Sequence, residues 1–118
     1  LIVSGVFQYF HEEDIIRFIR ECKEKFANGE LIFDATSKGG LIFTNRFIKR
    51  TGNKTALMYF YVEDSNDFAK KCGVTLLEER TFFKKVFKIL GAKLKFFTKV
   101  SMKIAERKKQ VKILHLKL

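Results

Sequence analysis

Residues able to bind a ligand lie at the ends of two apolar runs in the first third of the chain. Ser4 and Gly5, with Tyr9 beyond them, follow the first run, and Asp34 and Thr36 close the second. In open α/β sheets, ligands bind beyond the carboxyl ends of parallel strands. Glycine lets a ligand approach the backbone, tyrosine offers a ring and a hydroxyl, and aspartate offers a carboxylate. The pattern therefore predicts a ligand site at these strand ends.

Two of these residues also have plainer interpretations. Asp34 can be a loop-start residue whose carboxylate binds nearby amides, and Tyr9 can be a partly buried aromatic. The histidines, His11 and His115, have no partner at the spacing of a metal site or a catalytic triad. We expect His11 to be a solvated residue at a helix start and His115 to lie on a strand face.

The elements that must position the candidate residues form a strand, a helix and a second strand. Residues 1–7 are an apolar run typical of a strand buried on both faces. Acids at residues 12–14 and apolar residues at three- and four-residue spacing predict a helix that ends at residues 28–29 in a left-handed cap. Residues 30–34 predict a second strand, which should be adjacent and parallel to the first.

The rest of the chain continues the alternation of helices and strands. The expected elements are a loop at 37–40, a helix at 41–50, a strand at 55–61, a helix capped by Asp64 or Ser65 and ending at Cys72, a strand at 74–80, a helix from 82 to about 109 and a strand at 111–118. No linker or repeat separates them, so residues 1–118 are expected to form one α/β domain or sub-domain.

The net charge is unevenly distributed. The formal charge of +11 suggests a nucleic acid or an anionic membrane as partner. Residues 1–80, however, carry twelve Lys and Arg against twelve Asp and Glu, whereas residues 81–118 carry twelve against Glu106 alone. The whole excess therefore belongs to the last third of the chain.

The basic segment at residues 84–117 allows two interpretations. Its lysines alternate with phenylalanines, which could stack on bases beside phosphate contacts or lie on an anionic membrane. Alternatively, the segment is an amphipathic helix whose apolar stripe belongs to the core and whose lysines are solvated. The helical spacing favours the second interpretation. The phenylalanines concerned are Phe82, Phe83, Phe87, Phe96 and Phe97.

The cysteines predict neither a disulfide framework nor a zinc site. Cys22 and Cys72 fall on expected buried helix positions and lack metal-ligand spacing. We interpret them as small apolar residues of a protein in the reducing cytoplasm, with no metal cofactor.

Residues 4–14 (SGVFQYFHEED) and 29–37 (GELIFDATS) resemble two motifs of one methyltransferase family. These are the S-adenosylmethionine-dependent O-methyltransferases related to leucine carboxyl methyltransferase and to the tetracenomycin polyketide synthesis methyltransferases. Residues 52–64 are similar to the middle of the same region. The resemblance runs from residue 1 to residue 80, with residues 112–118 as the last strand of the sheet.

The resemblance implies a Rossmann-like class I methyltransferase fold with strand order 3-2-1-4-5-7-6. Residues 1–118 would form its C-terminal half, strands 4-5-7-6 with flanking helices and the last strand antiparallel. It implies S-adenosylmethionine as cofactor and a carboxyl or hydroxyl of a small, polyketide-like molecule as acceptor. Ser4, Gly5 and Tyr9 would lie at the cofactor, and Asp34 and Thr36 on the substrate side, while no residue is assigned as a catalytic acid or base. Ser4 stands where many members have glutamate.

The same resemblance implies that the sequence is a fragment. The glycine-rich loop after the family's first strand and the acid after its second do not occur in this sequence, so we expect the chain alone to be inactive. Its first strand would have an unpaired edge, and such edges recruit another chain, most simply a second copy. We expect a homo-oligomer through that strand and no membrane partner. The alternative function is a non-enzymatic basic module that binds nucleic acid or an anionic surface through residues 84–117.

Overall fold

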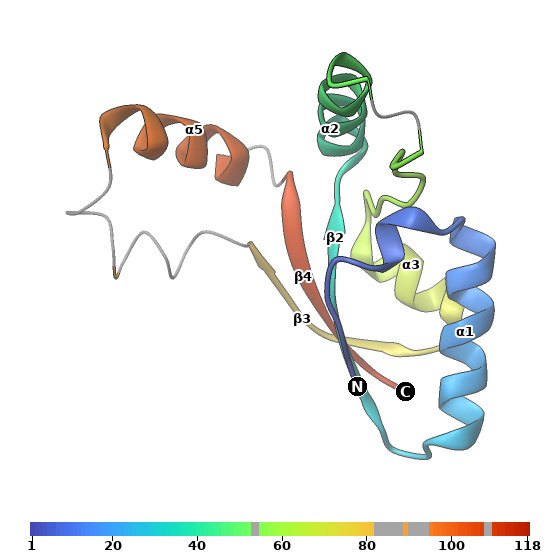
Figure 1. Ribbon diagram of the computed structural model, residues 1–118. Helices are drawn as coiled ribbons and strands as arrows, with labels where there is room; N and C mark the ends of the chain where they lie inside the picture. Colours follow the sequence, from blue (N-terminus) through green and yellow to red (C-terminus); the bar gives the residue numbers. More distant parts are fainter. Residues whose placement is uncertain (53–54, 82–88, 90–94, 108–109) are drawn as a thin grey trace.

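The computed structural model describes residues 1–52, 55–81, 89, 95–107 and 110–118 (Figure 1). Its elements follow in the order β1 Ile2–Val3, the short 3-10 helix η1 Phe7–Tyr9, α1 Glu12–Lys25, β2 Glu30–Thr36, α2 Lys38–Arg50, α3 Ser65–Cys72, β3 Thr75–Thr81, α5 Phe96–Arg107 and β4 Val111–Lys117. Helices and strands therefore alternate along most of the described chain.

In the described part of the chain, the strands form one mixed sheet in the order β1-β2-β4-β3. β1 and β2 are parallel, with Ile2 opposite Ile32 and Val3 opposite Phe33. The predicted strand–helix–strand unit of parallel strands is therefore confirmed. β4, the last strand in the chain, is antiparallel to both of its neighbours. The α/β class predicted from the sequence is confirmed.

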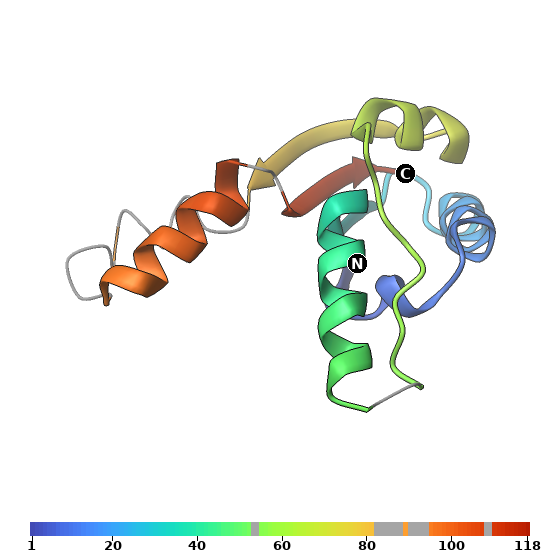
Figure 2. The ribbon, with the colours of Figure 1, turned by 90° about the horizontal axis from the view of Figure 1, so that it is seen from above.

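The core lies between the sheet and a layer formed by α1 and α3, on the same side of the sheet (Figure 2). Alternate residues of β2 point into it because successive side chains of a strand face opposite sides. α1 contributes its apolar stripe, and α3 adds Phe68, whose ring centroid lies 6.0 Å from that of Phe33. The most completely buried side chains are Phe33, Phe60, Ile15, Ile19, Leu31, Leu114, Leu116 and Cys72.

The expectation for residues 1–7 is wrong in part. β1 covers only Ile2 and Val3, and the chain then turns at Gly5, which has φ +67°. The side chain of Ile2 is 79% exposed, because β1 is the edge strand of the described sheet. An apolar run has the same composition at an edge as in the middle of a sheet, so the sequence could not distinguish the two.

The first helix is confirmed, but it ends at Lys25 with Phe26 as its C-cap, before the predicted residues 28–29. α1 follows His11 and carries Glu12, Glu13 and Asp14 in its first turn, where negative charge is favourable. After the helix, Asn28 takes the left-handed conformation with φ 63°. Of the predicted pair at residues 28–29, Asn28 is therefore the residue that reverses the chain.

Residues 37–40 are not a loop, because α2 begins at Lys38. The Ser37 hydroxyl caps the helix by accepting a hydrogen bond from the Gly40 amide at 3.2 Å. Glycines weaken a helix on average, so this sequence resembled a loop. A Cβ on Gly40 would lie 2.7 Å from the Gln110 carbonyl oxygen, so the close approach of β4 explains the glycine.

Residues 55–61 are not a strand. The segment is extended, but it crosses from α2 to α3 without joining the sheet. The amides of Tyr59 and Phe60 donate to the Gln8 carbonyl instead. Phe60 is 1% exposed, so the aromatic composition that predicted a strand reflects burial rather than sheet pairing.

The other described helices and strands agree with those predicted from the sequence. Asp64 caps α3, Gly73 ends it with φ 72°, and β3 and β4 are the expected strands. The helix predicted from residue 82 to about 109 is present as α5 over Phe96–Arg107, and most of residues 82–94, with Gly91, lie outside the described residues.

None of the helices in the described part of the chain has the length and apolar composition that crossing a bilayer requires.

The phenylalanines at the start of α5 do not belong to the core. Phe97 is 84% exposed and Phe96 is 74% exposed, and Ile104 on the same helix is 49% exposed. Figure 1 shows α5 set apart from the sheet and its helical layer. The interpretation of this stripe as a core face is therefore wrong for the described residues. A helical period shows that one face is apolar, but not what covers that face.

Candidate functional site

The carboxyl ends of β1, β2 and β3 meet at one edge of the sheet. β1 and β2 are parallel, and β3 shares their direction because β2 and β3 both pair antiparallel with β4. The turn after β1, α2 after β2, and the segment between β3 and β4 that contains α5 all leave from this edge (Figure 1). Ligands of open α/β sheets bind at such an edge, so we call it the carboxyl edge and build the site there.

Gly5 and Asp34, predicted at neighbouring strand ends, are in direct contact. The Gly5 amide donates a hydrogen bond to Asp34 Oδ1 at 2.6 Å. A Cβ placed on Gly5 would meet Gln8 Nε2 at 4.0 Å and no closer atom. Gly5 is therefore required by its positive φ, and the space above it is open, as the close approach of a ligand requires.

Asp34 lies within β2 rather than after it, since the strand continues to Thr36. Its half-buried side chain is on the sheet face opposite the core, between the buried residues Phe33 and Ala35. The hydrogen bond from Gly5 is the amide contact that the plainer interpretation predicted. Among the described residues, Oδ2 of Asp34 accepts no hydrogen bond, so the carboxylate keeps one acceptor atom for a ligand.

Ser4 and Tyr9 lie on exposed backbone after β1, whereas Thr36 is held inside the fold. Tyr9 is 46% exposed, so it is an exposed aromatic rather than the partly buried one that the plainer interpretation predicts. The Thr36 hydroxyl donates to the Gln110 carbonyl at 2.6 Å, and the Thr36 carbonyl accepts the Val62 amide at 2.9 Å. Thr36 thus ties β2 to the start of β4 and positions the edge rather than facing a ligand.

An open pocket of about 420 Å³ lies at the end of β2. Ile42 and Phe43 of α2 form its apolar wall, and Arg46 and Glu63 bring charged groups to it. Arg46 makes no ion pair within the described residues. Ser37, Gly39 and Gln110 complete the lining. The pocket can hold a small molecule that has an apolar body and an anionic or polar group.

Sequence reasoning did not identify the charged residues of this pocket. Glu63 precedes the expected cap at Asp64, and its Oε1 accepts the Lys38 amide at 2.7 Å. Arg46 belongs to α2, whose first turn has the glycine-rich sequence of a loop. The one available signal was the position of Ser37 before α2, since a serine followed by a helical pattern marks a helix start.

Lys112 fixes the Glu63 side of the pocket from inside the core. Its side chain is 3% exposed, and Nζ donates to the Glu63 carbonyl at 3.0 Å and to Ser65 Oγ at 3.3 Å. Nζ lies 3.6 Å from Glu79 Oε2, which also accepts a hydrogen bond from the Ser65 hydroxyl at 2.5 Å. Lys112 lies on the core face of β4, in step with Leu114.

The remaining titratable residues considered in the sequence lie outside this site. His11 stands at the start of α1 without a side-chain cap hydrogen bond, and His115 lies on a strand face with Nε2 2.9 Å from Glu30 Oε2, both as expected. Cys22 and Cys72 are buried free thiols, also as expected. Burial raises the pKa of Cys22 and raises that of Cys72 to about 11, so neither is a nucleophile at neutral pH.

Among the described residues, no group of three or more His, Cys, Asp or Glu side chains could hold a metal ion.

Comparison with known proteins adds no assignment. No family model matches the chain, and a search of curated proteins finds no match.

Proposed function

We propose that the chain forms the C-terminal half of a Rossmann-like class I methyltransferase and takes part in S-adenosylmethionine-dependent O-methyl transfer. The order of the sheet carries the proposal. The first, second, fourth and third strands of the chain lie side by side, and the fourth is antiparallel. The resemblance implies the same arrangement, 4-5-7-6 with strand 7 antiparallel. A sheet in which a terminal strand inserts antiparallel between two parallel ones is a specific topology, so the agreement supports the proposal.

The geometry at the carboxyl edge supports the placement of the cofactor and the acceptor. Open space above Gly5 and the exposed ring of Tyr9 suit a cofactor that passes close to the backbone, with Ser4 beside them. Asp34 joins the ends of β1 and β2 through the Gly5 amide. The pocket beside Arg46 then suits the acceptor, which on this proposal has an apolar, polyketide-like body and a carboxyl or hydroxyl group.

Methyl transfer depends more on the positioning of the two reactants than on an acidic or basic catalytic residue. S-adenosylmethionine, when bound, supplies an electrophilic methyl group. With both molecules bound, the acceptor oxygen would attack that carbon in line, forming an O–C bond as the S–C bond breaks and leaves its electron pair on sulfur. A carboxylate acceptor has no proton to lose, whereas a hydroxyl acceptor would release its proton to solvent water, since no residue is assigned as a base. The apolar wall at Ile42 and Phe43 would hold the acceptor body, and alignment of the reacting atoms supplies much of the rate.

A titration followed by nuclear magnetic resonance tests the site in this chain. We expect no micromolar affinity for S-adenosylmethionine by calorimetry, because the family's glycine-rich loop is not in the sequence. At millimolar S-adenosylhomocysteine, the amide signals of Ser4, Gly5 and Tyr9 should shift. Gly5→Ala strains a positive φ and should reduce these shifts, whereas Gly73→Ala strains a positive φ away from the edge and should leave them unchanged. Shifts confined to other regions would reject the site.

The gene provides an independent test of the whole proposal. The coding sequence upstream of Leu1 should encode a strand, a GxG turn and a helix, and the protein of the complete gene should transfer methyl groups. Asp34→Asn should weaken the hydrogen bond from the Gly5 amide, because the side-chain oxygen of asparagine bears less negative charge than a carboxylate oxygen. The variant should lower methyl transfer about tenfold or more. An upstream sequence without that unit would remove the methyltransferase proposal.

We also propose that, in the 118-residue chain without the family's first strand, a second copy of the chain pairs with β1. The strand has a neighbour on one side only in the described sheet, and Leu1 and Ile2 are 54% and 79% exposed. An apolar sheet edge of this kind recruits another strand, and a two-fold partner presents the same edge in return.

A further inference from the structure

Two helices at the carboxyl edge expose apolar side chains beside basic ones. On α2, Phe43 and Phe47 are 67% and 63% exposed, and on α5, Phe96 and Phe97 are 74% and 84% exposed. Phe96 and Phe97 pack on each other, with ring centroids 6.0 Å apart, rather than on the body of the protein. Solvent-facing aromatics in this number are unusual for a soluble surface and mark a contact with another surface.

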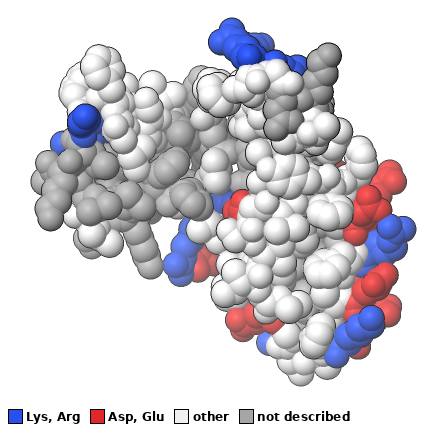
Figure 3. Space-filling view, in the orientation of Figure 1, with Lys and Arg blue, Asp and Glu red and all other residues white. Residues whose placement is uncertain are grey.

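The charges of both helices are mostly positive, with Glu106 near the end of α5 as the exception. The sequence of α2 contains Lys and Arg and no acid, and residues 95–104 contain three lysines and no acid. By contrast, α1 and α3 carry acids in their first turns. Figure 3 shows the same division: Lys and Arg without Asp or Glu at the end of the molecule formed by α2 and on the described surface of α5, and mixed charges along α1.

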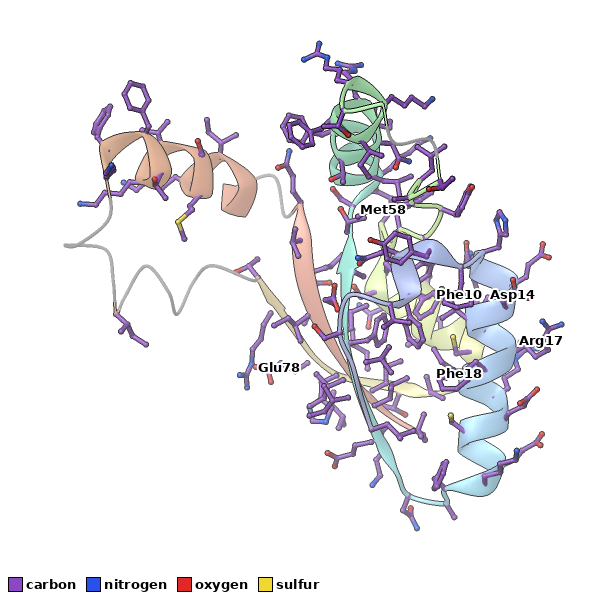
Figure 4. The ribbon with its side chains drawn as sticks, viewed as in Figure 1. Phe10, Asp14, Arg17, Phe18, Met58 and Glu78 are labelled. Atoms are coloured by element: carbon purple, nitrogen blue, oxygen red, sulfur yellow. The ribbon has the colours of Figure 1, made fainter. Side chains whose placement is uncertain are left out.

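Helical spacing places the charges of α5 directly beside its apolar stripe. At 100° per residue, Phe96, Val100 and Ile104 fall on one side, with Phe97 at its margin, and the lysines at 95, 99 and 103 lie along the adjacent side. Val100 and Ile104 are 39% and 49% exposed. Figure 4 shows the described side chains of α5 away from the sheet. The helix is therefore amphipathic with its apolar side outward.

We infer that the surface formed by α2 and α5 docks on an anionic lipid bilayer. A bilayer accepts both features together, since the apolar side chains enter the boundary of headgroups and acyl chains while the lysines meet anionic headgroups. Nucleic acid fits less well, because Val100 and Ile104 cannot stack on bases as aromatic rings do. This inference does not depend on the proposed methyl transfer. It departs from the expectation of no membrane partner.

Binding to lipid vesicles, measured by co-sedimentation of the full chain, tests the inference. The chain should bind vesicles of phosphatidylcholine and phosphatidylserine, and far less to phosphatidylcholine alone, with affinity falling as salt rises. Lys49→Gln/Lys95→Gln/Lys103→Gln should weaken binding about 100-fold, since each lysine near an anionic surface contributes roughly fivefold. The matched control, Arg17→Gln/Lys25→Gln/Lys70→Gln, removes the same charge elsewhere and should change binding much less.

A second pair of variants tests how much the exposed aromatic side chains contribute to vesicle binding. Phe47→Ser/Phe97→Ser should weaken vesicle binding about tenfold or more, whereas Phe26→Ser/Leu77→Ser removes apolar side chains that are about half exposed elsewhere and should not. Circular dichroism checks that each variant is folded. The inference fails if the control pair weakens binding as much as the test pair, or if vesicles do not bind. It also fails if a single-stranded oligonucleotide binds more tightly than the anionic vesicles in the same buffer.

Discussion

Lys112 is the residue whose environment departs most from its sequence context. Lysine is almost never fully buried without partners, and here Nζ has a carbonyl, a hydroxyl and a carboxylate around it. These partners come from the start of α3 and from β3, so one ammonium group connects three parts of the fold. It also holds the backbone at Glu63, whose side chain lines the pocket.

Replacing Lys112 by methionine keeps the aliphatic stem and removes the charge. We expect the free energy of unfolding to fall by about 2–3 kcal/mol, less than the ~3–5 kcal/mol for a fully buried pair because Glu79 is partly exposed. Urea denaturation followed by circular dichroism measures this. The control, Lys103→Met on the exposed side of α5, should stay within about 0.5 kcal/mol of the wild type. Equal stability of the two variants would contradict a structural role for Lys112.

The buried thiol of Cys72 makes stability depend on alkaline pH. Its pKa rises from 9.0 to about 11 because burial disfavours the thiolate. Between these values the folded state holds a proton that the unfolded state has lost, so stability falls as pH rises, by about 1–2 kcal/mol. Urea unfolding at about pH 8 and about pH 10.5 should show this fall in the wild type and a smaller one in Cys72→Ala. Equal falls in both proteins would exclude Cys72 as the cause.

At the scale of the element, the start of α2 depends on two adjacent glycines with different surroundings. A Cβ on Gly40 would lie 2.2 Å from Thr36 Oγ1 and 2.7 Å from the Gln110 carbonyl oxygen, whereas one on Gly39 would lie 3.9 Å from its nearest neighbour, Ser37 Oγ. The close approach of β4 therefore excludes a side chain at Gly40 but not at Gly39.

Alanine at each of these glycines should have opposite effects. Gly40→Ala should lower the free energy of unfolding by about 1–3 kcal/mol through overpacking. Gly39→Ala should raise it by about 0.4–1 kcal/mol, since alanine costs less backbone entropy in a helix than glycine. Thermal unfolding of the two variants gives the comparison. A loss of stability in Gly39→Ala as large as in Gly40→Ala would show that helix propensity, not contact with β4, decides both positions.

At the scale of the whole molecule, the exposed edge of β1 predicts association. At tens of micromolar we expect light scattering to report a dimer or larger assembly. Ile2→Lys places a charge on the edge, and charged residues are how natural edge strands avoid pairing, so this variant should be a monomer. Leu77→Lys, on β3 at the other edge of the sheet, should leave the assembly intact. A monomeric wild type would reject pairing through β1.

The order of the elements could be predicted from the sequence because it depends on local signals. The apolar spacing of α1, its acidic first turn and Asn28 all act within a few residues of one another. The parallel pairing of β1 and β2 follows from the short return between α1 and β2, which leaves few alternatives. The concentration of positive charge after residue 80 is likewise a property of the sequence alone.

The tertiary structure decided which side chains meet across long separations. Thr36 and Gln110 join β2 to β4, and Lys112 reaches Glu63 and Ser65, contacts that no local pattern encodes. Burial was decided in the same way: the aromatic segment around Phe60 is buried without sheet pairing, and the helical stripe at Phe97 is exposed. A local pattern states that a face is apolar or that a chain is extended. The residues that contact this face or segment come from distant parts of the sequence. Those contacts form only when the chain folds.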